Sequence, residues 1–200
     1  MLLLFAAIAL SIERITYLAI WRRPEAFRAL CAYGPLARLG EPVDALRRLF
    51  YGFKALQALV FVGWIAWYGG WFGDHAQLWS SAPAALALGV VSIALGQSLN
   101  LAVFHRLGRV GVFYGARFGH EVPWVRGFPF SMLAHPQYVG TVASIWGLLL
   151  ATRFPHPDWI VLPMLETLYY ALGARLEREP VAATDLPSPL RSPLSDPEPG

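Results

Sequence analysis

Residues 82–104 read APAALALGVVSIALGQSLNLAVF, a mostly apolar run that contains no charged side chain. A helix needs about 20 residues, within a range of about 17–25, to cross the hydrocarbon core of a bilayer. The run is long enough and apolar enough to cross, so we predict a transmembrane helix here.

Four further apolar segments lie on either side of this run, and the two that follow it are short. FPHPD at 154–158 separates the last two and is typical of a tight turn. The pattern predicts an all-α integral membrane protein, a bundle of four to five hydrophobic helices with a C-terminal helical hairpin. Because Glu13 and Arg14 interrupt the first segment, we expect that segment to stay within one leaflet. The five segments cover 2–21, 55–72, 82–104, 138–151 and 159–174.

The composition also indicates a membrane protein. Of the 200 residues, 56% are hydrophobic and 14% are charged, whereas a soluble domain has about 25% charged residues. The net charge of +3 comes from scattered arginines, which argues against a nucleic-acid partner. The single cysteine, Cys31, excludes an internal disulfide and a cluster of thiol ligands. We expect no bound metal.

Positive charge is distributed unevenly among the connecting regions. Arginines gather in 22–48 and 105–130, whereas 73–81 contains neither Lys nor Arg. Since positively charged loops stay in the cytoplasm, we expect the first two regions and the C-terminus on that side. Residues 181–200 are rich in Pro, Ser and Asp, which predicts a disordered tail after a membrane domain that covers 1–180.

The polar residues between the third and fourth segments end in HPQYVG, residues 135–140. A His-Pro pair is typical of a helix start, because proline suits the first helical position. Tyr138 then lies about one turn inside the fourth segment, and Gly140 leaves room for a close approach to the backbone. These residues by themselves fit a ligand site or a plain helix cap.

The wider stretch resembles the phospholipid N-methyltransferases, above all the plant and algal members. HPxYxG is shared with the isoprenylcysteine carboxyl methyltransferases, whereas the stretch from GARFG to FPF points to phospholipid. The resemblance is strong from about 95 to 146 and weak before 82. The matching motifs are LG at 107–108, GVFYGARFG at 111–119, PWV at 123–125, FPF at 128–130 and PQYVG at 136–140.

This resemblance implies S-adenosylmethionine as methyl donor, bound mainly within 82–180. Family members bind it with a Gly-x-Gly in the third membrane segment and a Glu pair after the last. These sites align with 94–96 and 177–179, where this chain has Ala-Leu-Gly and Glu-Arg-Glu and so departs from both patterns. The predicted cofactor residues are Ala94, Leu95, Gly96, His135, Tyr138, Gly140, Glu177, Arg178 and Glu179.

Each group has a structural alternative. Small residues at 94–96 also serve close helix packing, and the carboxylates of Glu177 and Glu179 also fit a solvated charge patch. Carboxylates do suit the ammonium, the sulfonium and the ribose hydroxyls of the donor. The predicted hairpin would return Glu177 to the face that holds His135, as a shared site requires.

An amine that attacks a methyl group must first be neutral, so the reaction needs a base. His135 is the first candidate because an imidazole titrates near pH 7, and Glu179 is the second. A guanidinium can hold a phosphate through two hydrogen bonds. We therefore predict that Arg117 or Arg126 binds the lipid phosphate.

One carboxylate, Glu166, lies inside the fifth apolar segment. An ionisable residue at membrane depth is a candidate functional group. The alternative is a protonated or paired side chain, whose partner would be Arg153, Tyr169 or Tyr170.

The resulting hypothesis is N-methylation of phospholipid headgroup amines. The plant-type resemblance implies the monomethyl and dimethyl forms of phosphatidylethanolamine as acceptors, with phosphatidylcholine as end product, and phosphatidylethanolamine itself stays open. It also implies the endoplasmic reticulum membrane, although the residues leave a bacterial inner membrane open. The alternatives are a prenylcysteine carboxyl methyltransferase and a non-catalytic membrane protein. The sequence does not indicate an oligomeric state.

Overall fold

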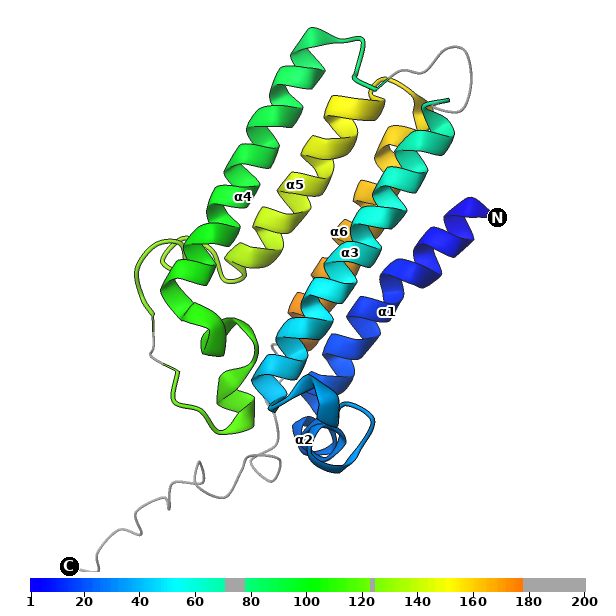
Figure 1. The fold of residues 1–200 in the computed structure, drawn as a ribbon. Coiled ribbons are helices and arrows are strands. Elements are labelled where there is room, and N and C mark those ends of the chain that lie inside the picture. The colour runs from blue at the N-terminus through cyan, green and yellow to red at the C-terminus, as the bar shows by residue number, and fades with distance from the viewer. Residues whose placement is uncertain (71–77, 123–124, 178–200) are drawn as a thin grey trace, which may run out of the picture.

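The computed structural model describes residues 1–70, 78–122 and 125–177 (Figure 1). All regular elements in this part of the chain are helical, and five long helices form the bundle. The predicted all-α membrane bundle is thereby confirmed. In chain order the elements are α1 (Leu2–Arg22), α2 (Pro24–Tyr33), η1 (Ala37–Leu39), α3 (Pro42–Tyr68), α4 (Pro83–Val112), η2 (Gly115–Phe118), α5 (Pro136–Arg153), η3 (Pro157–Ile160) and α6 (Val161–Glu177).

Proline sets the start of four helices. α2, α3, α4 and α5 begin at Pro24, Pro42, Pro83 and Pro136, respectively. The first turn of a helix has no use for the N–H that proline lacks, and the ring fixes φ near its helical value. The His-Pro pair at 135–136 therefore begins a helix, as predicted.

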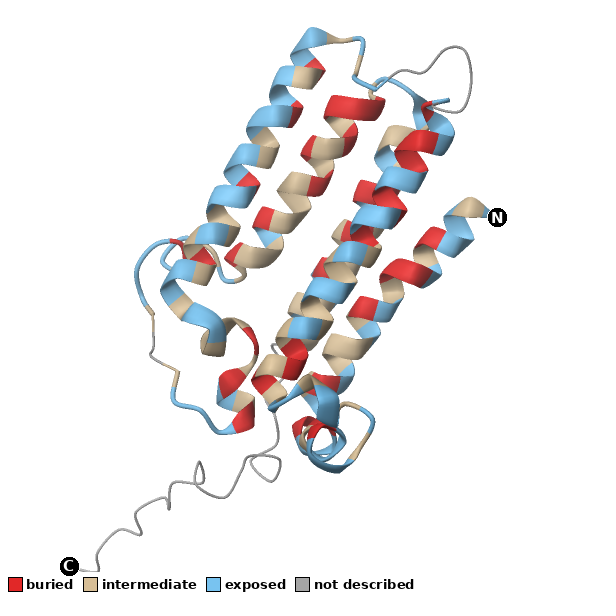
Figure 2. Ribbon diagram, in the orientation of Figure 1, coloured by how far each residue is buried: buried red, intermediate tan, exposed pale blue. Residues whose placement is uncertain are grey.

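The helices are arranged around α5 and α6. α4 packs along α5, α6 packs against both α5 and α1, and α3 contacts α1 and α5 (Figure 1). Buried positions lie on the inward sides of these helices, while the outer side of α4 is exposed (Figure 2). The central core is apolar, and its members include Leu10, Phe61, Trp64, Leu149, Leu162 and Tyr170.

Glycines bring the backbones of α4 and α5 close together. A Cβ added to Gly96 would lie 2.3 Å from the carbonyl oxygen of Gly140, and one added to Gly89 would lie 2.6 Å from that of Gly147. No real Cβ tolerates such contacts, so a side chain at these positions would force the helices apart. Small residues thus determine how α4 and α5 pack.

Three helical stretches are long and apolar enough to cross a bilayer among the described residues: α1, α3 and residues Pro83–Phe118. α1 continues without a break through Glu13 and Arg14, and it is long and apolar enough to cross, whereas we expected the first segment to stay within one leaflet. With 18 and 17 residues, α5 and α6 fall at the short end of the range for a span. They form the predicted hairpin, joined by η3.

The polar region 22–48 is more ordered than the loop we expected. It contains α2 and the first turns of α3, and both are amphipathic. Phe27 and Cys31 of α2 pack with Val43 and Leu46 of α3 in a second apolar core. A search for uniformly apolar runs misses such helices because only one face is buried.

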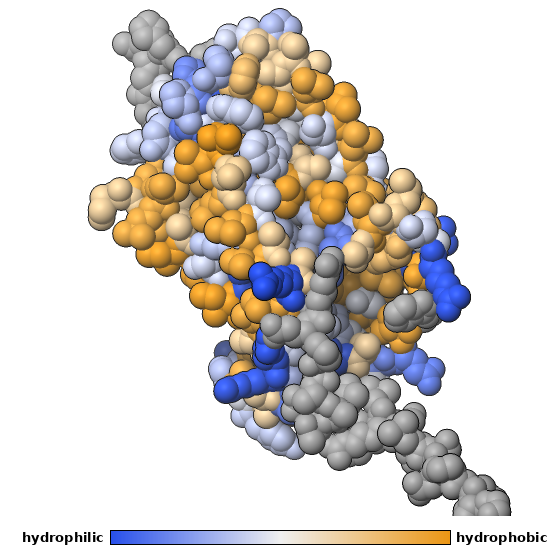
Figure 3. Space-filling view, turned by 180° about the vertical axis from the view of Figure 1, so that it is seen from behind, coloured by the Kyte–Doolittle hydropathy of each residue, from blue (hydrophilic) through white to orange (hydrophobic). Residues whose placement is uncertain are grey.

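The connections on either side of α2, the segment between α4 and α5, and the end of α6 lie at one end of the bundle (Figure 1). This is the relative placement that the charge pattern predicted, and its cytoplasmic orientation stays a prediction. Seen from behind, apolar side chains cover most of the surface, and strongly hydrophilic ones gather mainly in its lower half (Figure 3). The predicted tail, 181–200, lies outside the described residues.

Candidate functional site

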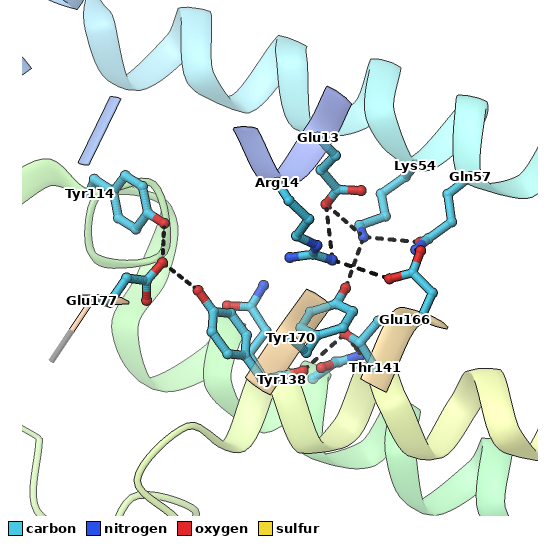
Figure 4. Close-up of polar contacts among 12 residues, drawn as sticks. Glu13, Arg14, Lys54, Gln57, Tyr114, Tyr138, Thr141, Glu166, Tyr170 and Glu177 are labelled. Carbon is cyan, nitrogen blue, oxygen red and sulfur yellow. Dashed lines mark hydrogen bonds and ion pairs between the residues drawn. The ribbon is translucent and has the colours of Figure 1, made fainter. Parts of the chain in front are cut away.

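A carboxylate at the end of α6 joins three helical elements. Glu177 Oε1 accepts a hydrogen bond of 2.6 Å from the hydroxyl of Tyr138 in α5 and one of 2.9 Å from that of Tyr114, just before η2 (Figure 4). Glu177 Oε2 has no hydrogen bond within the described part of the chain. We call these three residues the Glu177 junction.

Backbone geometry brings Tyr114 to this junction. α4 is kinked at Gly108, which has φ 61° and ψ −174°. Tyr114 itself has φ 56° and ψ 29°, the left-handed region that side chains rarely adopt. Such a conformation costs about 1–3 kcal/mol and persists where surrounding contacts hold it. Here it orients the tyrosine hydroxyl toward Glu177.

His135 lies beside the junction at the start of α5. Its ring stacks on that of Tyr138, with centroids 5.5 Å apart and an interplanar angle of 13°. Tyr138 also contacts Tyr170, whose ring meets the Tyr138 ring edge-on with centroids 5.2 Å apart. The hairpin therefore brings the His135 and Glu177 regions to one end of the bundle, as predicted.

A cavity of about 830 Å³ adjoins the junction, and α1, α3, α4, α5 and α6 all contribute to its lining. Tyr114 and Tyr138 belong both to the junction and to the cavity wall. The polar side chains of the wall include Arg14, Tyr17, Lys54, Asn100, Gln137 and Thr141. The apolar ones include Phe61, Val62, Leu101, Phe104, Ile145 and Leu148.

Charged side chains from α1, α3 and α6 meet at the polar wall (Figure 4). Lys54 Nζ donates hydrogen bonds to Glu13, Gln57 and the Tyr170 hydroxyl at 3.1, 3.1 and 3.4 Å. Gln57 in turn donates to Glu166, which is 1% exposed. The guanidinium of Arg14 lies 3.6 Å above the Tyr170 ring. These six side chains form what we call the charged cluster.

Glu166 is thus a paired buried side chain in this structure. Its partners are Gln57, by a 3.1 Å hydrogen bond, and Arg14, by a 3.7 Å ion-pair contact. The partners that we expected, Arg153, Tyr169 and Tyr170, make other contacts. Arg153 binds Asp158, Tyr169 donates to the carbonyl of Ala7, and Tyr170 accepts from Lys54.

The predicted glycine motif, residues 94–96, meets α5 at Gly140, two residues after Tyr138 of the Glu177 junction. Ala94 and Leu95 are exposed on α4, and neither lines the cavity. Gly96 is buried against Gly140, so both glycines serve the α4–α5 contact here. This is the helix-packing alternative for that motif, and a cofactor role for these residues stays a prediction.

The other predicted residues have varied positions. Arg117 lies with its guanidinium 3.7 Å above the ring of Trp21, and its carbonyl accepts a hydrogen bond from Arg28. Arg126 is exposed in the segment before α5. Neither arginine is among the residues that line the cavity. Arg178 and Glu179, together with Trp124 of the PWV motif, lie outside the described residues.

Sequence reasoning missed the cavity-lining cations of α1 and α3. Arg14 and Lys54 are charged residues inside or beside apolar runs, and such residues mark functional sites or buried pairs in membrane proteins. That signal was present, but we interpreted Glu13 and Arg14 as an interruption of the first segment. Only the packing of α1 against α3 and α6 reveals that they share one cluster.

Residues 84–183 match the family model described as phospholipid methyltransferase. The chain is 31% identical over 153 residues to the phosphatidyl-N-methylethanolamine N-methyltransferase of Arabidopsis thaliana, covering 76% of this chain and 82% of the plant protein. It is 37% identical over 102 residues to the human phosphatidylethanolamine N-methyltransferase, half the length of each. The yeast phosphatidyl-N-methylethanolamine N-methyltransferase is 34% identical over 97 residues, 48% of this chain and 46% of that protein. No solved structure matches significantly.

Proposed function

This chain belongs to the phospholipid methyltransferase family, and we propose that it methylates the headgroup amine of a membrane phospholipid. The observation that carries the proposal is the Glu177 junction, which adjoins a cavity lined by both polar and apolar side chains. A phospholipid likewise combines a polar headgroup with apolar acyl chains. Three of the helices that line this cavity, α1, α3 and α4, are long and apolar enough to cross a bilayer.

The acceptors we propose are the monomethyl and dimethyl forms of phosphatidylethanolamine, with phosphatidylcholine as end product. The plant relative, which is named for the monomethyl acceptor, matches over most of its length and supports this choice. The human relative is named for phosphatidylethanolamine and matches over half its length. The names of these relatives favour an amine acceptor over the carboxylate of a prenylated cysteine.

The methyl donor that family membership implies is S-adenosylmethionine, which supplies a methyl group bound to a cationic sulfur. The Glu177 junction fits such a donor. Two tyrosine hydroxyls hold one carboxylate oxygen of Glu177, and the other oxygen has no hydrogen bond among the described residues. That oxygen can accept from an ammonium or a ribose hydroxyl, and the carboxylate charge favours a nearby cation. The buried Asn100 Oδ1 is a second acceptor, and it accepts no hydrogen bond from the residues that the structure describes.

The amine of the acceptor must lose its proton before its lone pair can form the new N–C bond. We propose His135 as the proton acceptor, because its imidazole lies beside Tyr138 and imidazole is a common general base in enzymes. Glu179 stays the second candidate. Most of the rate would come from holding both reactants in line and away from water, which the enclosing helices favour.

Among the other predicted residues, Tyr138 and Glu177 have the strongest support as donor ligands. Gly140 contributes by allowing α4 and α5 to pack closely. Roles for 94–96 and for Arg178 in donor binding, and for Arg117 and Arg126 in phosphate binding, stay as predicted from the sequence.

Methyl transfer to separate acceptors tests the proposal. Purified protein would be reconstituted with radiolabelled donor and with phosphatidylethanolamine, its monomethyl form or its dimethyl form. We expect labelled lipid product from the monomethyl and the dimethyl acceptors. Label only in a prenylcysteine ester would instead support the carboxyl alternative, and no label with any acceptor would favour a non-catalytic protein.

On the resemblance alone we propose the endoplasmic reticulum as the membrane. Spans in the bundle support an integral membrane location without naming the organelle. Fractionation of cells that express the tagged chain tests this, and recovery in another membrane fraction would contradict it.

A further inference from the structure

We propose that Arg14 and Tyr17 of α1 bind the phosphate of the lipid acceptor at the wall of the cavity. The inference rests on the proposed function and adds a binding site to it. Both residues lie outside 84–183, the region that matches the family model. The N-terminal part of the bundle would then supply the lipid-headgroup site, and the matched part the methyl-transfer site.

The first observation is a set of buried polar atoms without a hydrogen bond in the described part of the chain. They are Arg14 Nε, Arg14 Nη2 and the Tyr17 hydroxyl. Both side chains line the cavity. Buried donors are costly unless they are satisfied, so these atoms indicate a ligand that accepts hydrogen bonds.

The carboxylates near Arg14 do not accept hydrogen bonds from its Nη2. Its Nη2 lies 3.7 Å from oxygens of both Glu13 and Glu166, which allows electrostatic attraction but is too long for a hydrogen bond. Lys54, by contrast, donates to three acceptors within the charged cluster. Of these two cations, Arg14 therefore has hydrogen-bonding capacity left for an anion in the cavity.

Tyr17 connects this position to the Glu177 junction. Residues three apart lie on the same face of a helix, so Arg14 and Tyr17 are neighbours. The Tyr17 ring meets that of Tyr114 edge-on at 6.0 Å, and Tyr114 donates to Glu177. An anion held by Arg14 and Tyr17 would therefore be separated from Glu177 by the ring of Tyr114. That spacing suits a headgroup whose phosphate and amine are joined by a two-carbon linker.

The shape of the cavity points to an anion that carries apolar chains. Val62 of α3 and Leu101 of α4 line it and are also 52% and 71% exposed on the outside of the bundle. α3 and α4 each pack on α5 but have no extensive contact with each other. A phosphodiester with acyl chains that extend between these helices fits better than a free anion from water.

The main alternative is that Arg14 is only part of an ion-pair network that holds α1 to α6. Variants separate the two roles. Glu166 is buried, contacts Arg14 and does not line the cavity, so Glu166→Gln disrupts the network and leaves the phosphate donors in place. Tyr17→Phe removes a hydroxyl that makes no hydrogen bond to the described residues, so it should leave the fold intact.

The experiment measures lipid binding without methyl donor. Full-length protein in detergent would be titrated by native mass spectrometry with two lipids. One is phosphatidyl-N-methylethanolamine, which we call the charged lipid because its phosphate is anionic, and the other is an analogue whose phosphate is an uncharged triester. Arg109→Gln, an exposed arginine that pairs with Asp44, serves as matched control. We expect Arg14→Gln to weaken binding of the charged lipid at least tenfold, as loss of a hydrogen bond between charged groups implies. Tyr17→Phe should weaken it less and reduce the preference for that lipid, whereas Arg14→Gln should bind the two lipids almost equally.

Glu166→Gln and Arg109→Gln should keep the preference for the charged lipid. Equal loss of lipid binding in Glu166→Gln and Arg14→Gln would overturn the proposal in favour of the structural network. So would Arg14→Gln and Tyr17→Phe proteins with wild-type preference for the charged lipid. If Arg14→Gln fails to fold, the lipid preference of the Tyr17→Phe protein alone tests the proposal. Wild-type protein that prefers the charged lipid but transfers no methyl group would contradict the proposed function and leave the phosphate site standing.

Discussion

The Tyr138 hydroxyl donates a 2.6 Å hydrogen bond to Glu177 Oε1, linking the start of α5 to the end of α6. The two residues are 39 positions apart, and the hairpin between them returns the chain to the same end of the bundle. Tyr114 reaches the same carboxylate oxygen from the far end of α4. Three chain segments therefore converge on one carboxylate beside the cavity.

Removing the hydroxyl of Tyr138 should weaken donor binding. Tyr138→Phe keeps the ring that stacks on His135 but loses a hydrogen bond to a charged acceptor, worth about 1.5–3 kcal/mol. We expect S-adenosylmethionine affinity, measured by equilibrium dialysis, to fall about tenfold or more. Tyr33→Phe, at a residue that is 94% exposed, should bind normally. Equal affinity in the two variants would exclude a role for the junction in donor binding.

The contact between α4 and α5 should tolerate no added methyl group. A Cβ at Gly140 would lie 2.6 Å from the Gly96 carbonyl oxygen, so Gly140→Ala should lower stability by about 1–3 kcal/mol. Gly63→Ala is the matched control, because nothing lies within 4 Å of its added Cβ. Thermal unfolding in detergent checks both. A Gly140→Ala protein as stable as the Gly63→Ala protein would show that the helices separate at little cost.

The turn between α5 and α6 depends on one buried ion pair. Arg153 donates from Nε and Nη2 to both carboxylate oxygens of Asp158 at 2.9 Å, and the arginine side chain is 3% exposed. Asp158→Asn should destabilise the fold by about 3 kcal/mol, since it leaves a buried charge unpaired. Asp44→Asn, at a side chain 33% exposed, should cost less, about 1 kcal/mol. Chemical unfolding that ranks the two variants in the opposite order would contradict this.

The single thiol should report on the packing of α2. Cys31 is 7% exposed, and burial raises the pKa of its thiol. At a given pH the folded protein therefore holds less reactive thiolate than an ordinary cysteine does. We expect slow maleimide labelling of native protein and fast labelling after denaturation. Equal rates in both states would mean that α2 does not pack as described.

Much of the fold could be predicted because long apolar runs specify membrane helices. The hairpin was predictable from the Pro-rich turn at 154–158. The amphipathic α2 and the first turns of α3 were not predicted, because their apolar faces are interrupted by arginines. Their burial depends on contact with each other, which no local pattern expresses.

The candidate site was predictable only in part. Motif resemblance pointed to Tyr138 and Glu177, and the structure brings these two into contact. The charged cluster was missed because Glu13, Lys54 and Glu166 lie on three different helices. The sequence did not predict Tyr114 as a site residue, although it lies within one of the matching motifs. Its left-handed backbone and its hydrogen bond to Glu177 have no sequence signature.

Methyl transfer by Glu177→Gln protein tests the central claim most directly, that the Glu177 carboxylate belongs to a methyl-transfer site for phospholipid amines. Wild-type protein, Glu177→Gln and the exposed control Glu25→Gln would be reconstituted in equal folded amounts with phosphatidyl-N-methylethanolamine and radiolabelled donor. We predict labelled dimethyl lipid from wild type and Glu25→Gln, and a rate at least about tenfold lower from Glu177→Gln, as loss of a charged hydrogen bond implies. A Glu177→Gln protein as fast as wild type, or a wild type that transfers no label, would contradict the claim.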